Sequence, residues 1–326
     1  MSFTKTAVLP VSPDEAFALI TEPERLRRWQ TVSAVVDLRA GGGYRWTVTP
    51  GHVAVGTFRE VEPGKRIVFG WGWEGNDELP PDASTVTITL EPTDGGSLIT
   101  LIHEGLTDAQ AAAHAEGWHH YVDRLEMLAV KGDAGPDEWA FAPENLDPII
   151  ASEAALVVLQ PVLRALTRED QPKQTPCADF TCHQLAEHLM ASIAQLGAMA
   201  GAEVVNPEEG SLENRVSVMA AQAIDAWRRA GLDGMVPGPG GAEMPASFAA
   251  GILPVELVLH GWDLAQASGQ ELHISDELVA YLMGLAEGLV PGGRQGGSFG
   301  PEVTPEAGAS PVDRLAAYAG RSPITA

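Results

Sequence analysis

Residues 251–269 read GILPVELVLHGWDLAQASG, and this stretch has the pattern of a helix buried among other helices. Pro254 falls in the first turn, where a helix tolerates proline, and Gly269 falls where helices commonly end. Large apolar side chains recur between them at intervals of three and four residues, at Leu253, Val255, Leu257, Leu259, Trp262 and Leu264. The sequence therefore predicts a core helix with both of its ends marked.

Two polar residues, Glu256 and His260, stand inside this apolar helix. Because they are four residues apart, their side chains leave the same face one turn from each other, and such a pair can bind one divalent metal ion. The alternative is an ordinary helix pair, in which Glu256 is hydrogen-bonded to His260 or both face water. The neighbouring Val, Leu and Trp residues favour the metal, because an unpaired ionised carboxylate is costly to bury among them.

The chain around this helix, from residue 146 to residue 326, has the texture of an all-helical domain. Periodic segments predict helices at 149–166, 181–200, 214–231, 251–268 and 276–289, and a short closing helix at 311–318. Pro161 is expected to kink the first of them. The segments 231–245 and 291–309 are rich in Gly and Pro and are expected to be irregular. Four main helices joined by moderate loops indicate a four-helix bundle.

The helix predicted at 181–200 supplies a third candidate ligand, His188. Thr181 followed by Gln184 forms a capping-box pattern, and His188 lies on the apolar side of the helix. A lone histidine there is more often a hydrogen-bonded core residue than a metal ligand. With Glu256 and His260, however, it would complete a set of three ligands from two facing helices. Three protein ligands and one open position describe a catalytic-type zinc site.

The first 131 residues predict strands with a helix near either end. Strands are expected at 5–10, 33–37, 43–48, 53–61, 66–73, 84–90 and 97–103, and the long final helix at 107–130. Ser12 and Glu15 mark the start of the first helix with a capping-box pattern. Gly-rich and Pro-Gly turns separate the middle strands, as antiparallel hairpins require.

Four tryptophans of this half, Trp29, Trp71, Trp73 and Trp118, are candidates to line a pocket for an apolar small molecule. The alternative is that these large rings fill the core of a curved sheet. The pairs His103-Glu104 and His119-His120 are interpreted as solvated or structural, because adjacent side chains diverge.

This half resembles the activator-of-Hsp90-ATPase-homologue (AHSA1-like) group of START-like, or SRPBCC, domains. The resemblance implies a helix-grip fold, in which a curved sheet folds around a long C-terminal helix with a cavity between them. It implies no chaperone partner. The residues that carry it are Val11 to Phe17, Thr21, Trp29, Asp37 to Arg39, Gly41 to Arg45, Gly56 to Phe58, Glu60 to Arg66, Trp71, Trp73, His103 to Leu106 and Gly117-Trp118.

The second half resembles a DinB-like metal-binding family, the one that contains the mycothiol-dependent maleylpyruvate isomerases of actinobacteria. The resemblance implies that His188, Glu256 and His260 bind a divalent metal ion, zinc above all, and that the cofactor is mycothiol or another low-molecular-weight thiol. The chain departs from the isomerases by ending in an Arg-containing tail in place of their separate C-terminal domain. The motifs that carry the resemblance are Thr175 to Thr181, Leu185, His188-Leu189, Glu256, His260 to Ala265, Gly269, Ser298 to Gly300, Asp313 to Leu315 and Gly320-Arg321.

These resemblances imply a metal- and thiol-dependent transferase or isomerase, in which a thiolate attacks a small electrophile. Asp263 is a candidate to orient His260 from behind, and a helix-surface or structural position is its alternative. Cys177 is interpreted as a small half-buried residue, because the sequence places no His or Asn beside it. Two other classes stay open: a non-catalytic small-molecule-binding protein with a structural metal, and a metal-dependent hydrolase.

Composition sets the frame for these hypotheses. The 326 residues allow two domains, predicted at 1–131 and 146–326 with a linker at 132–145. A net charge of −24 and a pI near 4.6 oppose nucleic-acid binding. The chain has only two cysteines, too few for a disulfide scaffold. We expect a cytoplasmic protein without a secretory signal or an apolar stretch long enough to cross a membrane, in an oligomeric state that the sequence leaves open.

Overall fold

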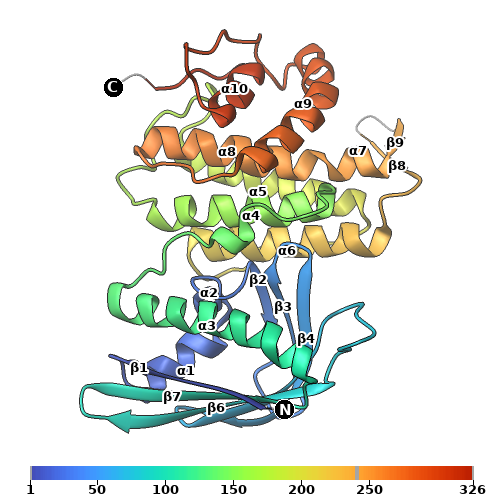
Figure 1. The fold of residues 1–326 in the computed structure, drawn as a ribbon. Helices are drawn as coiled ribbons and strands as arrows, with labels where there is room; N and C mark the ends of the chain where they lie inside the picture. Colours follow the sequence, from blue (N-terminus) through green and yellow to red (C-terminus); the bar gives the residue numbers. More distant parts are fainter. Residues whose placement is uncertain (1, 239–241, 325–326) are drawn as a thin grey trace. The chain divides into compact units, whose positions relative to one another are not determined.

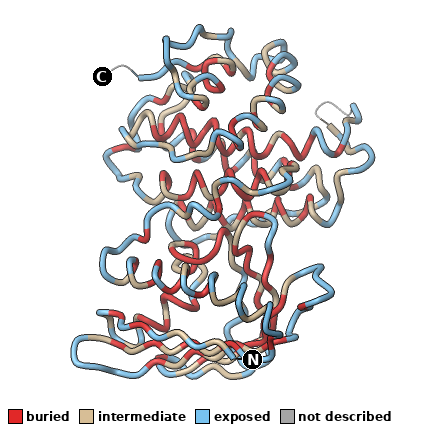
Figure 2. Tube along the Cα trace, viewed as in Figure 1, coloured by how far each residue is buried: buried red, intermediate tan, exposed pale blue. Residues whose placement is uncertain are grey.

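The computed structural model describes residues 2–238 and 242–324, and the chain forms two compact units (Figure 1). Unit 1 is Met1–Asp137 and unit 2 is Glu138–Ala326. The division falls inside the predicted linker. Each unit carries its own buried residues (Figure 2).

Unit 1 is built on a seven-stranded antiparallel sheet in the order β1-β7-β6-β5-β4-β3-β2. The first strand pairs with the last, so that Thr6 lies opposite Thr100. Side chains alternate between buried and less buried along β6 and β7, as expected where one face of a sheet covers a core. The strands are β1 (Ser2–Leu9), β2 (Ser33–Val36), β3 (Gly43–Thr49), β4 (His52–Glu62), β5 (Arg66–Trp71), β6 (Ser84–Thr93) and β7 (Gly96–Glu104).

Three helices complete unit 1, and the long α3 (Asp108–Lys131) lies over the sheet (Figure 1). A capping box formed by Thr107 and Gln110 starts α3, and Gly132 ends it in the left-handed conformation, with φ 77°. The shorter helices α1 (Pro13–Thr21) and α2 (Pro23–Leu26) connect β1 to β2. A sheet gripping a long C-terminal helix is the helix-grip arrangement, which confirms the fold predicted for this half.

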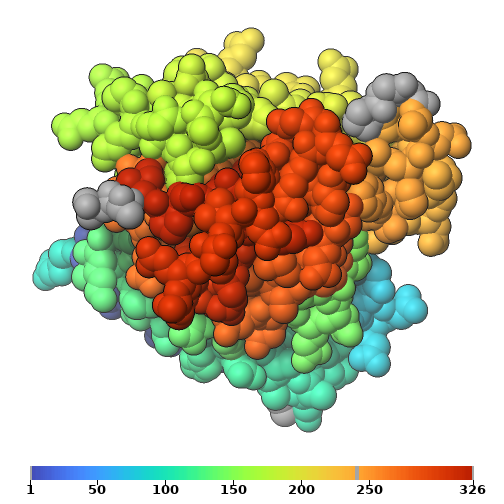
Figure 3. All heavy atoms as spheres, turned by 90° about the horizontal axis from the view of Figure 1, so that it is seen from above, coloured from blue at the N-terminus to red at the C-terminus, as the bar shows by residue number. Residues whose placement is uncertain are grey.

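Unit 2 is helical, and four of its helices contact one another in a closed ring. Helix α4 (Pro148–Ala165) contacts α6 (Leu212–Ala230) and α8 (Ile252–Ser268), while α5 (Cys182–Met199) contacts the same two from the other side. Two further helices, α9 (Asp276–Gly296) and α10 (Pro311–Tyr318), pack on α8 and on each other. The last part of the chain, orange to red in Figure 3, forms a continuous area of the surface of this unit.

The structure corrects one boundary and adds elements that the sequence analysis did not predict. Helix α9 continues past Pro291 to Gly296, so the expectation that residues 291–296 are irregular is wrong. One reason is Gly293: a Cβ there would lie 2.4 Å from the ring of Phe299, so the glycine lets the following loop pack against the helix. The added elements are η1 (Glu138–Ala140), α7 (Ala246–Ala250), β8 (Met235–Pro237) and β9 (Glu243–Pro245).

Two segments, Pro148–Ala165 and Ala246–Ser268, are long and apolar enough to cross a membrane by length and composition alone. The expectation that no stretch reaches this limit is therefore wrong by this criterion. Their apolar windows are 61% and 83% buried inside the fold. Core helices of soluble proteins pass the same test, so the two segments are weak grounds for a membrane span.

Candidate metal centre

The candidate metal centre lies where α5 and α8 pack against each other in unit 2. Helix α8 is apolar over most of its length, and Leu257, Val258 and Leu259 between the two candidate ligands are almost fully buried. Helix α5 begins at a capping box in which Thr181 and Gln184 satisfy each other's backbone amides. These two elements fix the directions in which His188, Glu256 and His260 project.

The structure brings these three predicted residues together. One ligand atom of each lies within 4.8 Å of the others. His260 Nε2 is 3.4 Å from Glu256 Oε2, and the imidazoles of His188 and His260 meet edge to face with centroids 5.2 Å apart. A helix pair alone would explain the first contact, but it would not bring His188 in from another helix. The three side chains are therefore arranged so that they could hold one ion.

Asp263 lies on the other side of His260 and is completely buried, which excludes the helix-surface alternative. Its Oδ2 atom is 3.1 Å from His260 Nδ1 and accepts a hydrogen bond of 3.2 Å from Arg321 Nε. A carboxylate only accepts, so the contact with His260 requires the imidazole proton on Nδ1. The other ring nitrogen, Nε2, faces Glu256.

The electrostatics of the cluster are coupled. Burial by itself raises the pKa of Glu256, but the hydrogen bond and charge of His260, with the charge of Arg321, outweigh it and lower that pKa. Burial lowers the pKa of His260, but its hydrogen bonds to Asp263 and Glu256 outweigh that effect and raise it. Burial and the charge of His260 lower the pKa of His188, which keeps its imidazole neutral at physiological pH. Glu256 is thus an anion beside a neutral His188.

The loop before α5 adds two contacts. Phe180 stacks on the imidazole of His188, with centroids 4.7 Å apart and planes 21° from parallel. Cys177, together with His260 and Asp263, forms a second group whose ligand atoms lie within 4.8 Å. Thr175 Oγ1 donates to the carbonyls of Cys177 and Phe180, at 3.0 Å and 2.8 Å, and so holds the loop in shape. Burial and the charge of Asp263 raise the pKa of the Cys177 thiol to about 11, so the thiol stays protonated.

The four tryptophans of unit 1 belong to its core cluster: Trp29, Trp71 and Trp118 are buried and Trp73 is partly buried. Trp71 contacts both Trp73 and Trp118, with centroids 5.4 Å and 5.2 Å away. The indole of Trp29 donates to the Leu19 carbonyl at 2.9 Å. The structure thus places three of these rings against one another and Trp29 on a backbone partner.

Two histidines accept hydrogen bonds from these rings. Trp118 Nε1 donates to His103 Nδ1 at 3.0 Å, and Trp71 Nε1 donates to His114 Nε2 at 3.2 Å. His103 is fully buried, so its role is structural rather than solvated. Of the other pair, His120 Nε2 is 2.9 Å from Asp137 Oδ1 and His119 meets Phe3 edge to face.

Sequence reasoning missed three residues of these sites: Arg321, Phe180 and His114. Arg321 lies 58 residues after Asp263, and no periodic pattern joins the two. The sequence did contain one indication of Arg321: two acidic residues, Glu256 and Asp263, stand in the apolar helix α8. Buried carboxylates need a cationic partner, which has to come from elsewhere in the fold. Phe180 stood in the quoted entry motif without a role, and only the helix packing brings its ring onto His188.

Comparison with known proteins supports a family for unit 1 and leaves unit 2 without one. The family model described as activator of Hsp90 ATPase homolog 1-like protein matches residues 10–129. An uncharacterized protein of Mycobacterium tuberculosis is 28% identical over 188 residues, which cover 54% of this chain and 99% of that protein. Because unit 1 has 137 residues, this alignment includes residues of unit 2.

Solved structures that are similar to part of the chain include the following two. An AHSA1-like protein from Rhizobium etli is 40% identical over 45% of this chain and 91% of that one, with a TM-score of 0.37. CalU16 from Micromonospora echinospora is 27% identical over 41% of this chain and 77% of that one, with a TM-score of 0.35.

Proposed function

We propose that this chain, whose N-terminal unit is an AHSA1-like domain, is a metal- and thiol-dependent transferase or isomerase that acts on a small electrophile. In this proposal unit 2 is a DinB-like four-helix bundle and His188, Glu256 and His260 hold the metal. A cytoplasmic location and a small-molecule substrate belong to the same proposal. The observation that carries it is the convergence of these three side chains from α5 and α8.

The donor set suits a divalent metal of the zinc type. Two imidazoles and one carboxylate form a ligand set found in catalytic zinc sites. The Nδ1 of His260 faces Asp263, and metal-binding histidines almost always have such a partner, which fixes the ring and its tautomer. His188 is neutral and therefore has a lone pair to offer. The residues present thus fit the ion.

The three proposed ligands differ in their exposure to solvent, and this favours an open coordination position on the metal. The side chain of His260 is 3% exposed, whereas that of Glu256 is 18% exposed and His188 is half-buried. Among the described residues, the group that contains His188 and Glu256 has three members, and Cys177 belongs to the other group, with His260 and Asp263. A closed structural zinc site would have four.

A divalent ion at this position would lower the pKa of a bound thiol and so provide a thiolate at neutral pH. The residues of the chain bind and orient: Asp263 and Arg321 hold His260 in place, and the ring of Phe180 covers one face of His188 and keeps water from it. Cys177 is not one of the three proposed ligands, and the nucleophile we propose is a small thiol, mycothiol or a relative, rather than a side chain of the protein.

Calorimetric titration of a low-molecular-weight thiol into the zinc-loaded full chain tests the proposal. We expect the thiol to bind, and we expect this binding to disappear after chelation and in His188→Ala. We also expect the zinc-loaded chain with its thiol to accelerate the loss of a small electrophile at neutral pH. Hydrolysis of the electrophile without the thiol would favour the hydrolase instead. Absence of both thiol binding and turnover in the loaded protein would contradict the enzyme and leave a binding protein.

A further inference from the structure

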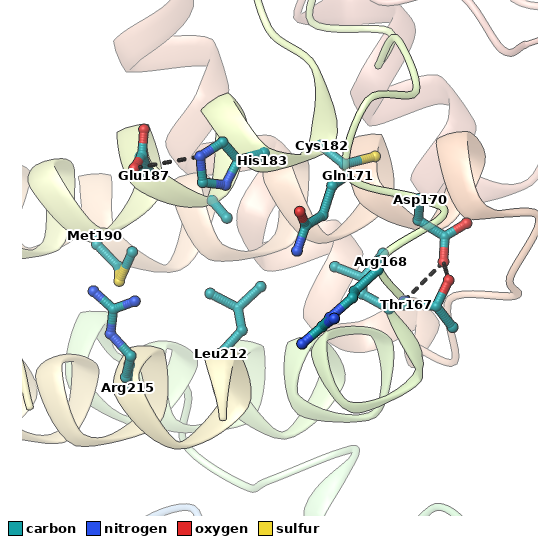
Figure 4. Close-up of a pocket in the computed structure, with 12 residues that line it drawn as sticks. Thr167, Arg168, Asp170, Gln171, Cys182, His183, Glu187, Met190, Leu212 and Arg215 are labelled. Carbon is teal, nitrogen blue, oxygen red and sulfur yellow. Dashed lines mark hydrogen bonds and ion pairs between the residues drawn. The ribbon is translucent and has the colours of Figure 1, made fainter. Parts of the chain in front are cut away.

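A second site lies in unit 2, in a hollow of about 350 Å³ between the end of α4 and the starts of α5 and α6 (Figure 4). This volume falls at the lower end of the range of small-ligand sites. The side chains around it include basic, acidic, polar and apolar ones. They are Leu166, Thr167, Arg168, Asp170, Gln171, Cys182, His183, Ala186, Glu187, Met190, Leu212 and Arg215.

Two arginines give this hollow its charge. Figure 4 shows the guanidinium groups of Arg168 and Arg215 pointing into the space on either side of Leu212. The Nε of Arg215 donates to the neutral amide of Asn206 at 3.0 Å. Within residues 2–238 and 242–324, no carboxylate forms an ion pair with either arginine. Neither guanidinium group therefore has a carboxylate partner in the described part of the chain, although the chain has 44 acidic and only 20 basic residues.

The acidic groups of the hollow already have partners. The carboxylate of Asp170 accepts from the backbone and hydroxyl of Thr167, at 2.8 Å and 2.7 Å, and pairs with Lys173 at 2.7 Å. Glu187 lies 3.6 Å from His183 with 63% of its side chain exposed. The starts of α5 and α6 also border the hollow and add the positive ends of two helix dipoles. Asp170 is thus compensated by Lys173, and the two guanidinium groups outnumber Glu187, the other carboxylate of the lining.

The lining also contains four apolar side chains, Leu166, Ala186, Met190 and Leu212. Arginine presents a planar fork of donors that matches a carboxylate. We propose that this hollow binds a small amphipathic carboxylate, with its anionic end on Arg168 and Arg215 and its apolar body on these four side chains. The site goes beyond the metal-dependent activity and requires neither the metal nor a thiol.

The hollow and the metal centre use different faces of α5. His183, Ala186, Glu187 and Met190 line the hollow at intervals of three and four residues, so they share one face. His188 follows Ala186 by two residues and so leaves the helix about 200° away. Loss of the metal site should therefore leave the hollow intact.

Calorimetry with the full chain tests this site, with octanoate as the probe and octanamide as its uncharged counterpart. We expect octanoate to bind and octanamide to bind at least about 10-fold more weakly, since a hydrogen bond to a charged group is worth about 1.5–3 kcal/mol. Arg168→Gln and Arg215→Gln should each weaken octanoate binding by about 10-fold or more. Arg229→Gln removes one exposed charge from α6 away from the hollow and should leave binding unchanged.

Further variants and ligands show whether the probe binds at this site or elsewhere on the chain. His188→Ala should retain octanoate binding, which distinguishes failure of this proposal from failure of the metal centre. Octanoate binding that survives Arg168→Gln and Arg215→Gln would place the ligand elsewhere and overturn the proposal. So would equal affinity for octanamide, or binding of inorganic phosphate in place of octanoate.

Discussion

The carboxylate of Asp263 is the residue on which the geometry of the metal centre depends most. Its Oδ2 atom meets both His260 Nδ1 and Arg321 Nε, while its Oδ1 atom is buried without a hydrogen-bond partner among the described residues. One oxygen thus both fixes the imidazole and anchors the tail of the chain. Asp263 is a positioning residue in this arrangement, because it acts on the metal only through His260.

Replacement of Asp263 by asparagine keeps the shape of the side chain and removes its charge. We expect Asp263→Asn to fold and to bind zinc about 10- to 100-fold more weakly, because His260 loses the partner that orients it. Competition with a chromophoric chelator measures this affinity. Asp276→Asn, at the exposed start of α9, is the matched control and should bind zinc as the unchanged chain does. Equal affinities of the two variants would contradict the role given to Asp263.

The imidazole of His103 makes the stability of unit 1 depend on pH. Burial and the charge of His114 lower its pKa from 6.5 to about 3. The unfolded chain therefore binds a proton between pH 6.5 and pH 3 that the folded unit does not, so stability falls as the pH drops through that window. Lowering the pH from 7 to 5 should therefore reduce the free energy of unfolding of unit 1 by about 2 kcal/mol through this group.

His103→Gln tests this linkage, because its amide can still accept from Trp118 and donate to Ser84 without titrating. Amide hydrogen exchange in β6 and β7 reports the free energy of opening of this unit. We expect the variant to lose about 2 kcal/mol less than the unchanged chain between pH 7 and pH 5. The exposed His52→Gln should behave as the unchanged chain does, and an equal loss in all three would refute the assignment.

At the level of single residues, spacing and resemblance together predicted which side chains meet at the metal centre. His188, Glu256 and His260 lie in motifs whose helical period fixes the face of each residue. Arg321 and Phe180 were beyond such reasoning, because their contacts depend on how distant segments pack. The burial of Asp263 was left open for the same reason: the period of α8 alone does not say which neighbour covers that position.

Among the elements, α3 makes the contacts that hold the last residues of unit 1. Arg124 is almost fully buried, and its guanidinium donates to the carbonyls of Trp29, Gly135 and Pro136 at 3.0 Å, 3.0 Å and 2.9 Å. One side chain thus ties the helix to the segment after α2 and to the loop that follows Gly132. The loop is therefore held by α3 as well as by its own hydrogen bond from Gly135 N to Asp133 Oδ1.

Arg124→Met preserves most of the length of the side chain and leaves these carbonyls without a donor. We expect it to destabilise unit 1 by about 3 kcal/mol, because buried groups that lose a charged partner are costly. Urea unfolding followed by tryptophan fluorescence measures the change. Arg39→Met, at a site where 70% of the side chain is exposed, should cost about 0.5 kcal/mol or less. If Arg124→Met lowers the free energy of unfolding by as little as Arg39→Met does, the stabilising role given to the Arg124 contacts is wrong.

Most helices and strands followed from local pattern, and the exceptions have physical causes. The strands of unit 1 carry alternating burial and Gly-marked turns, and the helices of unit 2 carry caps that hydrogen-bond as predicted, such as Thr181 with Gln184. Pro291 misled the prediction, because the packing of Phe299 against Gly293 stabilises a helix that local propensity alone would end. The short α7 lacks any side-chain cap that could have announced it.

For the whole molecule, the two units differ in the polar groups that they bury. Unit 1 packs its tryptophans against the sheet and α3, and its two indole–histidine contacts are satisfied inside the core. In unit 2, Glu256, His260, Asp263 and Arg321 lie together at α8. The three candidate metal ligands lie in unit 2, and the central claim is that a metal ion belongs there.

Metal content measured by elemental analysis tests that claim most directly. The purified full chain should contain about one zinc ion, and His188→Ala and His260→Ala should lose it while their thermal unfolding shows that the fold survives. His273→Ala, an exposed histidine just before α9, should keep the ion. If the unchanged chain holds no metal even after reconstitution with zinc, the metal centre and the thiol chemistry proposed for it are both wrong.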